Sequence, residues 1–263
     1  MTTDMDIIAG NADLEALNRE IENPEQLRAY KIPYDGYKPL LLPRILGTFL
    51  VTCGNIVYGN KPSYLKFRAV EVIARVPYHS WASAAFTLLT CFYNDENRAM
   101  RLSKVAQYSR IAQDNETMHV IVISQLAKQE ERSGIIRHSI IPMFFAFFYF
   151  IASYLLYIIR PRWSFELNYL FESHAFAQYE EFLATRGEEL RNKPILSDFL
   201  NWYGRHPISQ YDFFLSVRND ELIHRNQAVR DIDMERDVAH RRRAWLIFGI
   251  LVFSIGLLAL FCG

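Results

Sequence analysis

The chain has 263 residues, of which 51% are hydrophobic and 14% aromatic, so it is long and apolar enough to bury a core within one domain. Its 29 basic and 29 acidic residues give a formal net charge of zero, and no segment combines basic with interleaved aromatic residues, which excludes nucleic acid as an expected partner. The three cysteines are far apart and show no C-x-x-C spacing. We therefore expect neither a disulfide framework nor a thiolate metal site, and a reducing compartment.

The N-terminal part, residues 1–39, is an acidic and polar arm with a short helix predicted near Leu14–Ile21. It matches neither a secretory signal nor an arginine-rich transit peptide. Residues 40–236 hold the apolar and helix-forming segments, and we expect a single helical domain there.

Two apolar segments of this domain are candidates for contact with a membrane. The first, Leu40–Tyr58, is interrupted by Pro43, Arg44 and Gly47, which favours a helix at the membrane surface over a membrane span. The second, Ser139–Ile159, is aromatic-rich and uncharged, and its length suits a transmembrane helix. A buried bundle helix and a helix lying on the membrane remain as alternatives for it.

Four further segments are predicted to be helices, and each carries a glutamate. They are Tyr64 to about Cys91 with Glu71, about Ala99–Lys128 with Glu116, Asn168–Arg186 with Glu172, and about Tyr211–Arg236 with Glu221. Glu71 in particular lies among apolar residues, and a buried carboxylate is costly unless it is paired with a cation or binds a metal. For Glu71, an ion pair with Arg75 at i+4 is the simpler alternative.

Two of the glutamates belong to Glu-x-x-His motifs, Glu116/His119 and Glu221/His224. Residues three apart lie on one face of a helix, so each pair is able to reach one metal ion. One motif alone would indicate a solvated helix face, but the second copy favours a metal site. In both copies a polar residue, Asn115 or Asp220, lies one turn before the histidine, where it is able to accept the second ring N–H and orient the ring.

The candidate ligands recur at similar intervals of 45, 53 and 49 residues, from Glu71 to Glu116, from His119 to Glu172 and from Glu172 to Glu221. A helix of about twenty residues, a turn and the returning helix bring the chain back to the same depth after roughly 45–50 residues, so we expect one layer of ligands. Glutamate on two helices and Glu-x-x-His on two others is the arrangement of di-iron and di-manganese proteins. The sequence predicts an all-α, ferritin-like four-helix bundle with membrane-interface helices and two iron or manganese ions.

The residues around each glutamate resemble the alternative oxidases over about residues 64–230. The matching blocks are VEVIARVPY from Val70, NETMH from Asn115, FESHA from Phe171 and RNDELIH from Arg218. The segment ESHA…YEEFL, residues 172–183, followed by GEELRNKP, residues 187–194, is especially similar to the plastid terminal oxidase branch.

This resemblance implies a di-iron quinol oxidase that passes electrons from ubiquinol or plastoquinol to O₂ and forms water without pumping protons. It implies two iron ions and assigns roles to residues of this sequence. The iron ligands would be Glu71, Glu116, Glu172 and Glu221, with His119 and His224 bound to the irons or beside them. Tyr179, seven residues after Glu172, matches a redox-active tyrosine. The quinol pocket would include Val70, Ala175 and Gln178, with Lys66 where the family usually has arginine, so a point charge replaces a planar fork.

The resemblance also implies a homodimer bound to one leaflet of a mitochondrial inner, plastid thylakoid or bacterial inner membrane, with the catalytic domain facing the matrix, stroma or cytoplasm. Association with respiratory or photosynthetic complexes would be compatible with that setting. Two alternatives stay open: a di-iron hydroxylase or desaturase acting on a lipid or quinone precursor, and a structural membrane subunit that has kept the bundle. His79 and His174 lie off the ligand faces and are expected to be structural or surface groups.

Residues 237–263 are a basic linker followed by Ala244–Cys262, nineteen residues without a charge, which predict a transmembrane anchor. Three consecutive arginines, at positions 241–243, precede it, so the helical domain is expected on the positive, cytoplasmic or matrix side. This span is not part of the alternative oxidase pattern, and it indicates a tail-anchored variant.

Overall fold

The computed structural model describes residues 8–130 and 134–236, and in these ranges regular structure is helical, with one isolated bridge between Pro194 and Ser209. The expected all-α class is confirmed. The elements are α1 (Asn11–Glu20), α2 (Pro24–Asp35), α3 (Leu41–Tyr58), α4 (Tyr64–Ala74), α5 (Val76–Phe92), α6 (Glu96–Glu130), the π-helical turn η2 (Ile136–Ile140), α7 (Ile141–Ile159), α8 (Pro161–Arg191), α9 (Asp198–Tyr203) and α10 (Gln210–Arg236). The predicted anchor Ala244–Cys262 lies outside the described residues.

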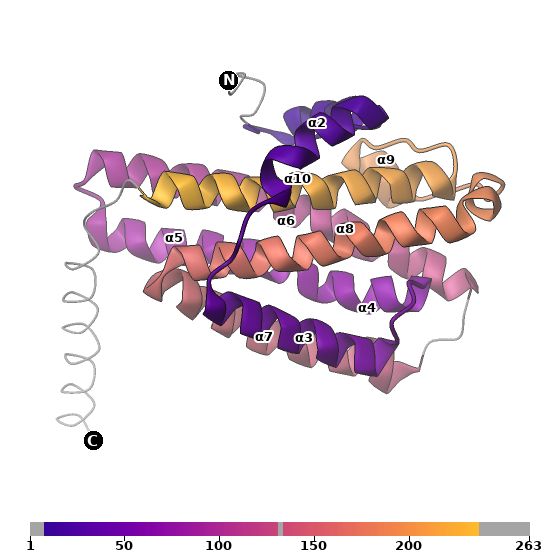
Figure 1. Ribbon diagram of the computed structural model, residues 1–263, viewed down its shortest axis with the longest axis horizontal. Coiled ribbons are helices and arrows are strands. Elements are labelled where there is room, and N and C mark those ends of the chain that lie inside the picture. The colour runs from indigo at the N-terminus through magenta and orange to yellow at the C-terminus, as the bar shows by residue number, and fades with distance from the viewer. Residues whose placement is uncertain (1–7, 131–133, 237–263) are drawn as a thin grey trace.

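A four-helix bundle is built from α4 with α5, α6, α8 and α10 (Figure 1). The helix α8 packs along α10, while α4 and α5 pack along α6. Two apolar clusters fill the interior: one contains Ala112 and Leu222, the other Met118 and Val217. Along the sequence, Glu116 lies between Ala112 of the first cluster and Met118 of the second, and Glu221 lies between Val217 of the second and Leu222 of the first. The polar centre therefore lies between two apolar layers.

The segment expected as one helix from Tyr64 to about Cys91 is divided at Arg75. Pro77 lies in the first turn of α5, where its missing N–H costs least, whereas in the interior of a continuous helix it would remove a hydrogen bond and clash with the preceding turn. The break keeps Glu71 on α4 and begins a new helix directly after it.

The N-terminal arm is folded onto the bundle. The predicted short helix near Leu14–Ile21 corresponds to α1, whose Leu14 and Leu17 are buried, and α1 packs against α10. The Asn23 side chain accepts a hydrogen bond from the Glu25 amide and so begins α2, with Pro24 in its first turn.

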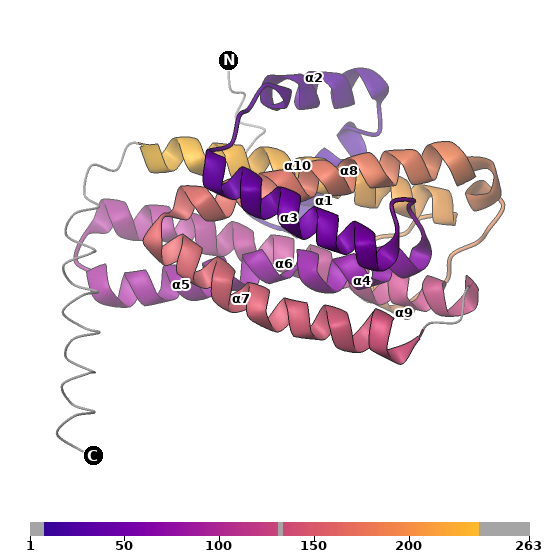
Figure 2. The same ribbon diagram turned by 60° about the horizontal axis from the view of Figure 1, so that its bottom comes forward.

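The two apolar helices α3 and α7 lie along one side of the bundle, and α2 lies on the opposite side (Figures 1 and 2). Both are long and apolar enough to cross a membrane, but few of their residues are buried in the protein. The alternative of a buried bundle helix for Ser139–Ile159 is therefore wrong: Phe144 is 60% exposed and Phe147 63%. Gly47 lets α3 approach α8 closely, because a Cβ there would lie 2.9 Å from Leu170 Cδ1.

Candidate metal centre

Six buried side chains form two adjoining groups whose potential ligand atoms lie within 4.8 Å of one another. The first group is Glu71, Glu116, His119 and Glu221, and the second is Glu116, Glu172, Glu221 and His224. Glu116 and Glu221 belong to both. These are the residues whose spacing predicted a shared layer, and the four bundle helices bring them together as two neighbouring clusters.

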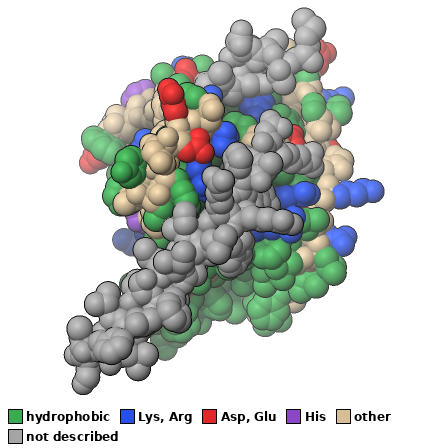
Figure 3. Space-filling model, turned by 90° about the vertical axis from the view of Figure 1, so that its left-hand side faces the viewer, with side chains coloured by type: hydrophobic (Ala, Val, Ile, Leu, Met, Phe, Trp, Pro, Cys, Tyr) green, Lys and Arg blue, Asp and Glu red, His purple; other side chains and the backbone are tan. Residues whose placement is uncertain are grey.

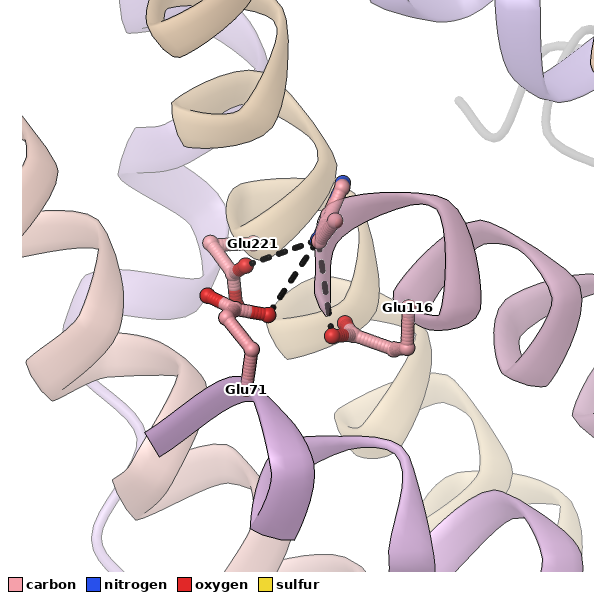
Figure 4. A group of neighbouring side chains, drawn as sticks. Glu71, Glu116 and Glu221 are labelled. Atoms are coloured by element: carbon pink, nitrogen blue, oxygen red, sulfur yellow. Dashed lines mark ion pairs between the residues drawn. The ribbon is translucent and has the colours of Figure 1, made fainter. Parts of the chain in front are cut away.

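The carboxylates of Glu71, Glu116 and Glu221 converge on one point, where they meet the imidazole of His119 (Figure 4). His119 Nδ1 lies 3.4 Å from Glu116 Oε2 and 3.5 Å from an oxygen of each of the other two. In the second group, His224 Nδ1 lies 2.8 Å from Glu116 Oε1. The ion pair proposed between Glu71 and Arg75 is not formed, because Arg75 is exposed and Glu71 is only 2% exposed.

Many polar atoms of the two groups make no hydrogen bond within the described structure. They include both carboxylate oxygens of Glu116 and of Glu221, His119 Nδ1, and both ring nitrogens of His224. Buried polar atoms are normally satisfied, and leaving this many without partners would be costly. Oxygen and imidazole donors pointing at two common points therefore fit two divalent metal ions, for which such donors are suitable ligands.

Burial and neighbouring charges shift the pKa values of the carboxyl groups in the cluster. Burial raises the pKa of Glu71 to about 7, and burial together with the charge of Glu116 raises the pKa values of Glu172 and Glu221. Burial acts in the same direction on Glu116, but the neighbouring His119 and His224 outweigh it and lower the pKa of that carboxyl. For His119, burial opposes the charged ring, yet the surrounding carboxylates raise its pKa above the ordinary value.

Two tyrosines bind the outer glutamates in a crossed pattern. Tyr179 on α8 donates a hydrogen bond to Glu71 on α4, and Tyr78 on α5 donates one of 2.7 Å to Glu172 on α8. Tyr78 follows Glu71 by seven residues, and Tyr179 follows Glu172 by seven residues. Each tyrosine binds the glutamate of the opposite segment, which lies antiparallel to its own. The sequence analysis used this spacing for Tyr179 and missed Tyr78, which the same spacing from Glu71 would have indicated.

Asp220 pairs with a different histidine from the one expected. The sequence predicted a contact between Asp220 and His224, one turn apart on α10, but the Asp220 carboxylate accepts a 2.9 Å hydrogen bond from His119 Nε2 on α6. Asn115 likewise makes no hydrogen bond to His119: its amide N–H groups donate to Asp220 Oδ2 and to the Tyr203 hydroxyl, and its amide oxygen accepts none. Residues one turn apart share a helix face, but here the side chains of Asn115 on α6 and Asp220 on α10 form hydrogen bonds between the two helices instead of along their own helix. This bond leaves His119 Nδ1 directed at the glutamates.

Asp220 is in turn held by residues that the sequence analysis missed. The buried Arg205 guanidinium donates to both Asp220 oxygens, at 2.5 and 3.2 Å, and also binds the carboxylate of Glu15 on α1. The Asn18 amide, also on α1, donates to Asp220 Oδ1 at 2.5 Å. Since the negative Asp220 lies beside Arg205 and His119, its pKa is lowered in spite of burial.

Comparison with known proteins agrees with the geometry of this centre. The family model of the alternative oxidases, described as "Alternative oxidase", matches residues 48–230. The chain belongs to the alternative oxidase family. It is also similar to a curated relative from Arabidopsis thaliana, Ubiquinol oxidase 4, chloroplastic/chromoplastic, with 26% identity over 141 residues. The match spans 54% of this chain and 37% of that relative, and no solved structure matches the chain. The resemblance to the plastid branch of the alternative oxidases is thereby confirmed.

Of the residues that the alternative oxidase resemblance suggested for a quinol pocket, two are in direct contact. Lys66 Nζ donates a hydrogen bond of 2.7 Å to Gln178 Oε1. It also donates to Asn55 Oδ1 at 3.0 Å and to the Asn60 carbonyl at 3.1 Å. Burial lowers the pKa of Lys66. Val70 and Ala175 are half-buried on α4 and α8, the helices that carry Lys66 and Gln178. The Lys66 ammonium thus connects the end of α3 to the helix of Tyr179.

Proposed function

We propose that this protein is a membrane-associated di-iron quinol oxidase, which oxidises a quinol and reduces O₂ to water. The main support for the proposal is the pair of buried Glu/His groups that share Glu116 and Glu221. Their potential ligand atoms lie within 4.8 Å of one another in each group, and many of them make no hydrogen bond in the described structure. Membership in the alternative oxidase family supports this reading over a bundle that has lost its metals.

The residues present fit an iron pair. Glu71 and His119 would hold one ion, Glu172 and His224 the other, and Glu116 and Glu221 would be shared by both. Four carboxylates approximately neutralise two divalent ions, which makes a buried cluster of this charge tolerable. When bound, a ferrous pair supplies electrons and open coordination positions for O₂.

The protein's own groups orient this centre. The Asp220 carboxylate accepts a hydrogen bond from His119 Nε2 and so orients the ring. His119 Nδ1 therefore faces the glutamates. Tyr179 is buried, and its hydroxyl donates a hydrogen bond to Glu71. Its ring is stacked on Phe67 with ring centres 4.1 Å apart. A phenol in this position is suited to pass an electron and a proton to the centre, which is the role proposed for Tyr179.

The quinol would approach from the side of α3 and α7. Lys66 and Gln178 lie between the end of α3 and α8, and Gln178 is adjacent to Tyr179 in the chain. We assign the quinol head group to this position, with the Gln178 amide as hydrogen-bond donor to its oxygens. The Lys66 ammonium, whose three N–H groups bind Asn55, the Asn60 carbonyl and Gln178, would hold Gln178 in place. Val70 and Ala175 would supply apolar contacts beside the head group.

The exposed apolar sides of α3 and α7 support attachment to one leaflet of a quinol-containing membrane. Both helices pack along the bundle, α3 on α8 and α7 on α4, α5 and α8. If either crossed the bilayer, it would draw polar side chains of the bundle into the hydrocarbon, so we place both at the membrane surface. A homodimer in a mitochondrial inner, thylakoid or bacterial inner membrane, with the bundle facing matrix, stroma or cytoplasm, is part of the proposal.

The test is oxygen uptake by the purified, iron-loaded protein supplied with ubiquinol or plastoquinol. Oxidation of two quinols per O₂ with water as product is expected, and Glu172→Gln should abolish it. Glu180→Gln, an exposed glutamate on the same helix, is the matched control and should retain it. No uptake with either quinol, or a hydroxylated or desaturated lipid product, would reject the oxidase in favour of the related di-iron reactions.

A further inference from the structure

The N-terminal helices α1 and α2 both contact α10, the helix that carries Glu221 and His224. Within the bundle α10 packs on α8 and α6, and α2 lies on the side opposite α3 and α7 (Figure 1). Seen from one end of the molecule, hydrophobic side chains gather in the lower part, whereas the upper part carries side chains of all types (Figure 3). The N-terminal arm therefore covers α10 on the more polar side of the molecule.

One buried residue of α1 is polar although its position favours an apolar side chain. Leu14, Leu17 and Ile21 are buried at helical spacing on one face, and Asn18, one turn after Leu14, shares this face and is only 2% exposed. An apolar side chain would dock α1 here without burying a polar group, whereas a buried amide is costly unless its N–H groups are bonded. The asparagine therefore indicates a role beyond docking.

The Asn18 amide donates two hydrogen bonds to a single turn of α10. Its Nδ2 donates to the Ser216 carbonyl at 2.7 Å and to Asp220 Oδ1 at 2.5 Å. In return, the side-chain amide of Asn219 donates to the Asn18 carbonyl at 3.0 Å. Asn219 and Asp220 are completely buried. These three bonds fix Asn18 over the turn of α10 that directly precedes Glu221.

Asp220, which accepts the Asn18 bond, is the partner of His119. Its Oδ2 accepts hydrogen bonds from His119 Nε2 at 2.9 Å and from Asn115 at 3.1 Å. Its Oδ1 accepts the 2.5 Å bond from Asn18 and a longer bond of 3.2 Å from Arg205. Asn18 is thus the closer donor to Oδ1, and a carboxylate held at Oδ1 keeps Oδ2 directed at the imidazole. Without the Asn18 amide, the carboxylate would be free to turn and the His119 ring would lose its fixed orientation.

The donor comes from outside residues 48–230, the part of the chain that matches the alternative oxidase family. We infer that Asn18 is a positioning residue of the candidate metal centre: acting through Asp220, it holds His119 with Nδ1 toward the glutamates of the first group. Within the described residues, the Asn18 side chain makes its hydrogen bonds to α10 and none to a candidate ligand. This inference rests on the metal centre of the proposed function.

The effect of Asn18 should be confined to one of the two metal ions. His119 belongs to the first group, and the second group contains His224 instead. Loss of a hydrogen-bond partner behind a metal ligand typically costs about 10- to 100-fold in metal affinity, so the ion beside His119 should be weakened by this factor. A general loosening of the bundle would weaken both ions alike.

The experiment titrates the metal-free full chain in detergent with ferrous ion under anaerobic conditions, in competition with a chelator of known affinity. The wild-type chain should bind two ions. In Asn18→Leu, whose side chain is similar in size but has no N–H, one ion should bind about 10- to 100-fold more weakly and the other within about threefold of the wild type. Glu172→Gln keeps the first group intact, and adding Asn18→Leu to it should weaken the remaining ion by the same factor.

Two further variants separate positioning from docking. Leu14→Ala removes a buried apolar contact of α1 and should lower the urea midpoint, but it should leave both dissociation constants for ferrous ion within about twofold of the wild type. Asn219→Ala releases the Asn18 carbonyl while the Asn18 amide and Asp220 are retained, and should weaken the ion of the first group by about fivefold. Circular dichroism should show equal helicity for all of these proteins.

Unchanged binding of both ions in Asn18→Leu, or equal weakening of the two, would overturn the inference. Equal effects of Asn18→Leu and Leu14→Ala on metal binding would overturn it as well. If Asn18→Leu does not fold, Asn219→Ala decides, and unchanged ferrous binding in that variant would refute the role of Asn18.

The same preparations distinguish this inference from the proposed function. A wild-type chain that binds no ferrous ion would reject the metal centre and the role of Asn18 together. Oxygen uptake with a quinol is measured separately. Its absence, with one ion selectively weakened in Asn18→Leu, would reject the oxidase while the positioning role of Asn18 stands.

Discussion

Replacing Arg205 with methionine should destabilise the protein by about 3 kcal/mol or more, because it removes the cation between two carboxylates. Arg205 is 6% exposed, donates to both oxygens of Asp220, and binds Glu15 on α1. Breaking a buried ion pair by removing one partner costs about 3–5 kcal/mol, since the other charge stays buried. Asp220 retains donors from Asn18 and His119, which places the expected loss near the lower limit.

Glu15 should contribute less than Arg205. Its side chain is 20% exposed, so in Glu15→Gln water takes over part of the lost interaction, and we expect about 1 kcal/mol. The two variants therefore separate the anchoring of Asp220 from the anchoring of α1.

The assay is urea unfolding of the metal-free protein in detergent, followed by circular dichroism at 222 nm. Arg28→Met, which removes an exposed arginine from α2, is the matched control and should change the free energy of unfolding by less than about 0.5 kcal/mol. If Arg205→Met costs less than about 1 kcal/mol, or no more than Glu15→Gln, the reasoning about the buried pair is refuted.

Three further predictions concern the centre itself. Glu116→Gln should lower the metal content from two ions per chain to below one, whereas Glu172→Gln should leave about one, because Glu116 belongs to both groups and Glu172 to one. Equal losses of metal in the two variants, measured by elemental analysis, would contradict the sharing of Glu116. The metal-free protein should lose stability as pH rises from about 5 to about 8. Glu71 has its pKa raised from 4.5 to about 7, so its stabilising contribution is fully present below 4.5 and is lost as pH rises through about 7, and His119, whose pKa is also raised, acts in the same direction. Urea midpoints that are flat or rise over this range would argue against the protonated cluster, and added ferrous ion should restore stability at the high end. Tyr179→Phe should bind two irons but turn over at least about 100-fold more slowly; unchanged oxygen uptake would remove Tyr179 from the reaction.

The six candidate ligands were accessible from sequence because they follow helix geometry. Glu116 and His119 share a face at a spacing of three residues, and regular intervals indicated that the four glutamates return to a common depth. The division of the helix at Arg75 was also within reach, since Pro77 is a known breaker. Local periodicity is sufficient for features of this kind.

Contacts between elements were not accessible in the same way. Asp220 was assigned to the histidine on its own helix because i,i+4 neighbours are the only ones a sequence pattern offers, whereas the bond to His119 depends on the packing of α6 against α10. Arg205 stands in the connection before α10, and Asn18 stands about two hundred residues before its partner. No spacing rule relates residues so far apart, so the support of Asp220 became visible only in three dimensions.

The crossed hydrogen bonds of the tyrosines have a mechanical consequence for metal loading. Tyr179 on α8 donates to Glu71 on α4, and Tyr78 on α5 donates to Glu172 on α8. One hydrogen bond is therefore donated by α8 to the α4–α5 segment, and the other is donated by that segment to α8. A slide of α8 by a single residue, about 1.5 Å, would strain both at once. The two hydrogen bonds therefore help to set the register of α8 against α4 and α5, and with it the spacing of the two candidate metal groups.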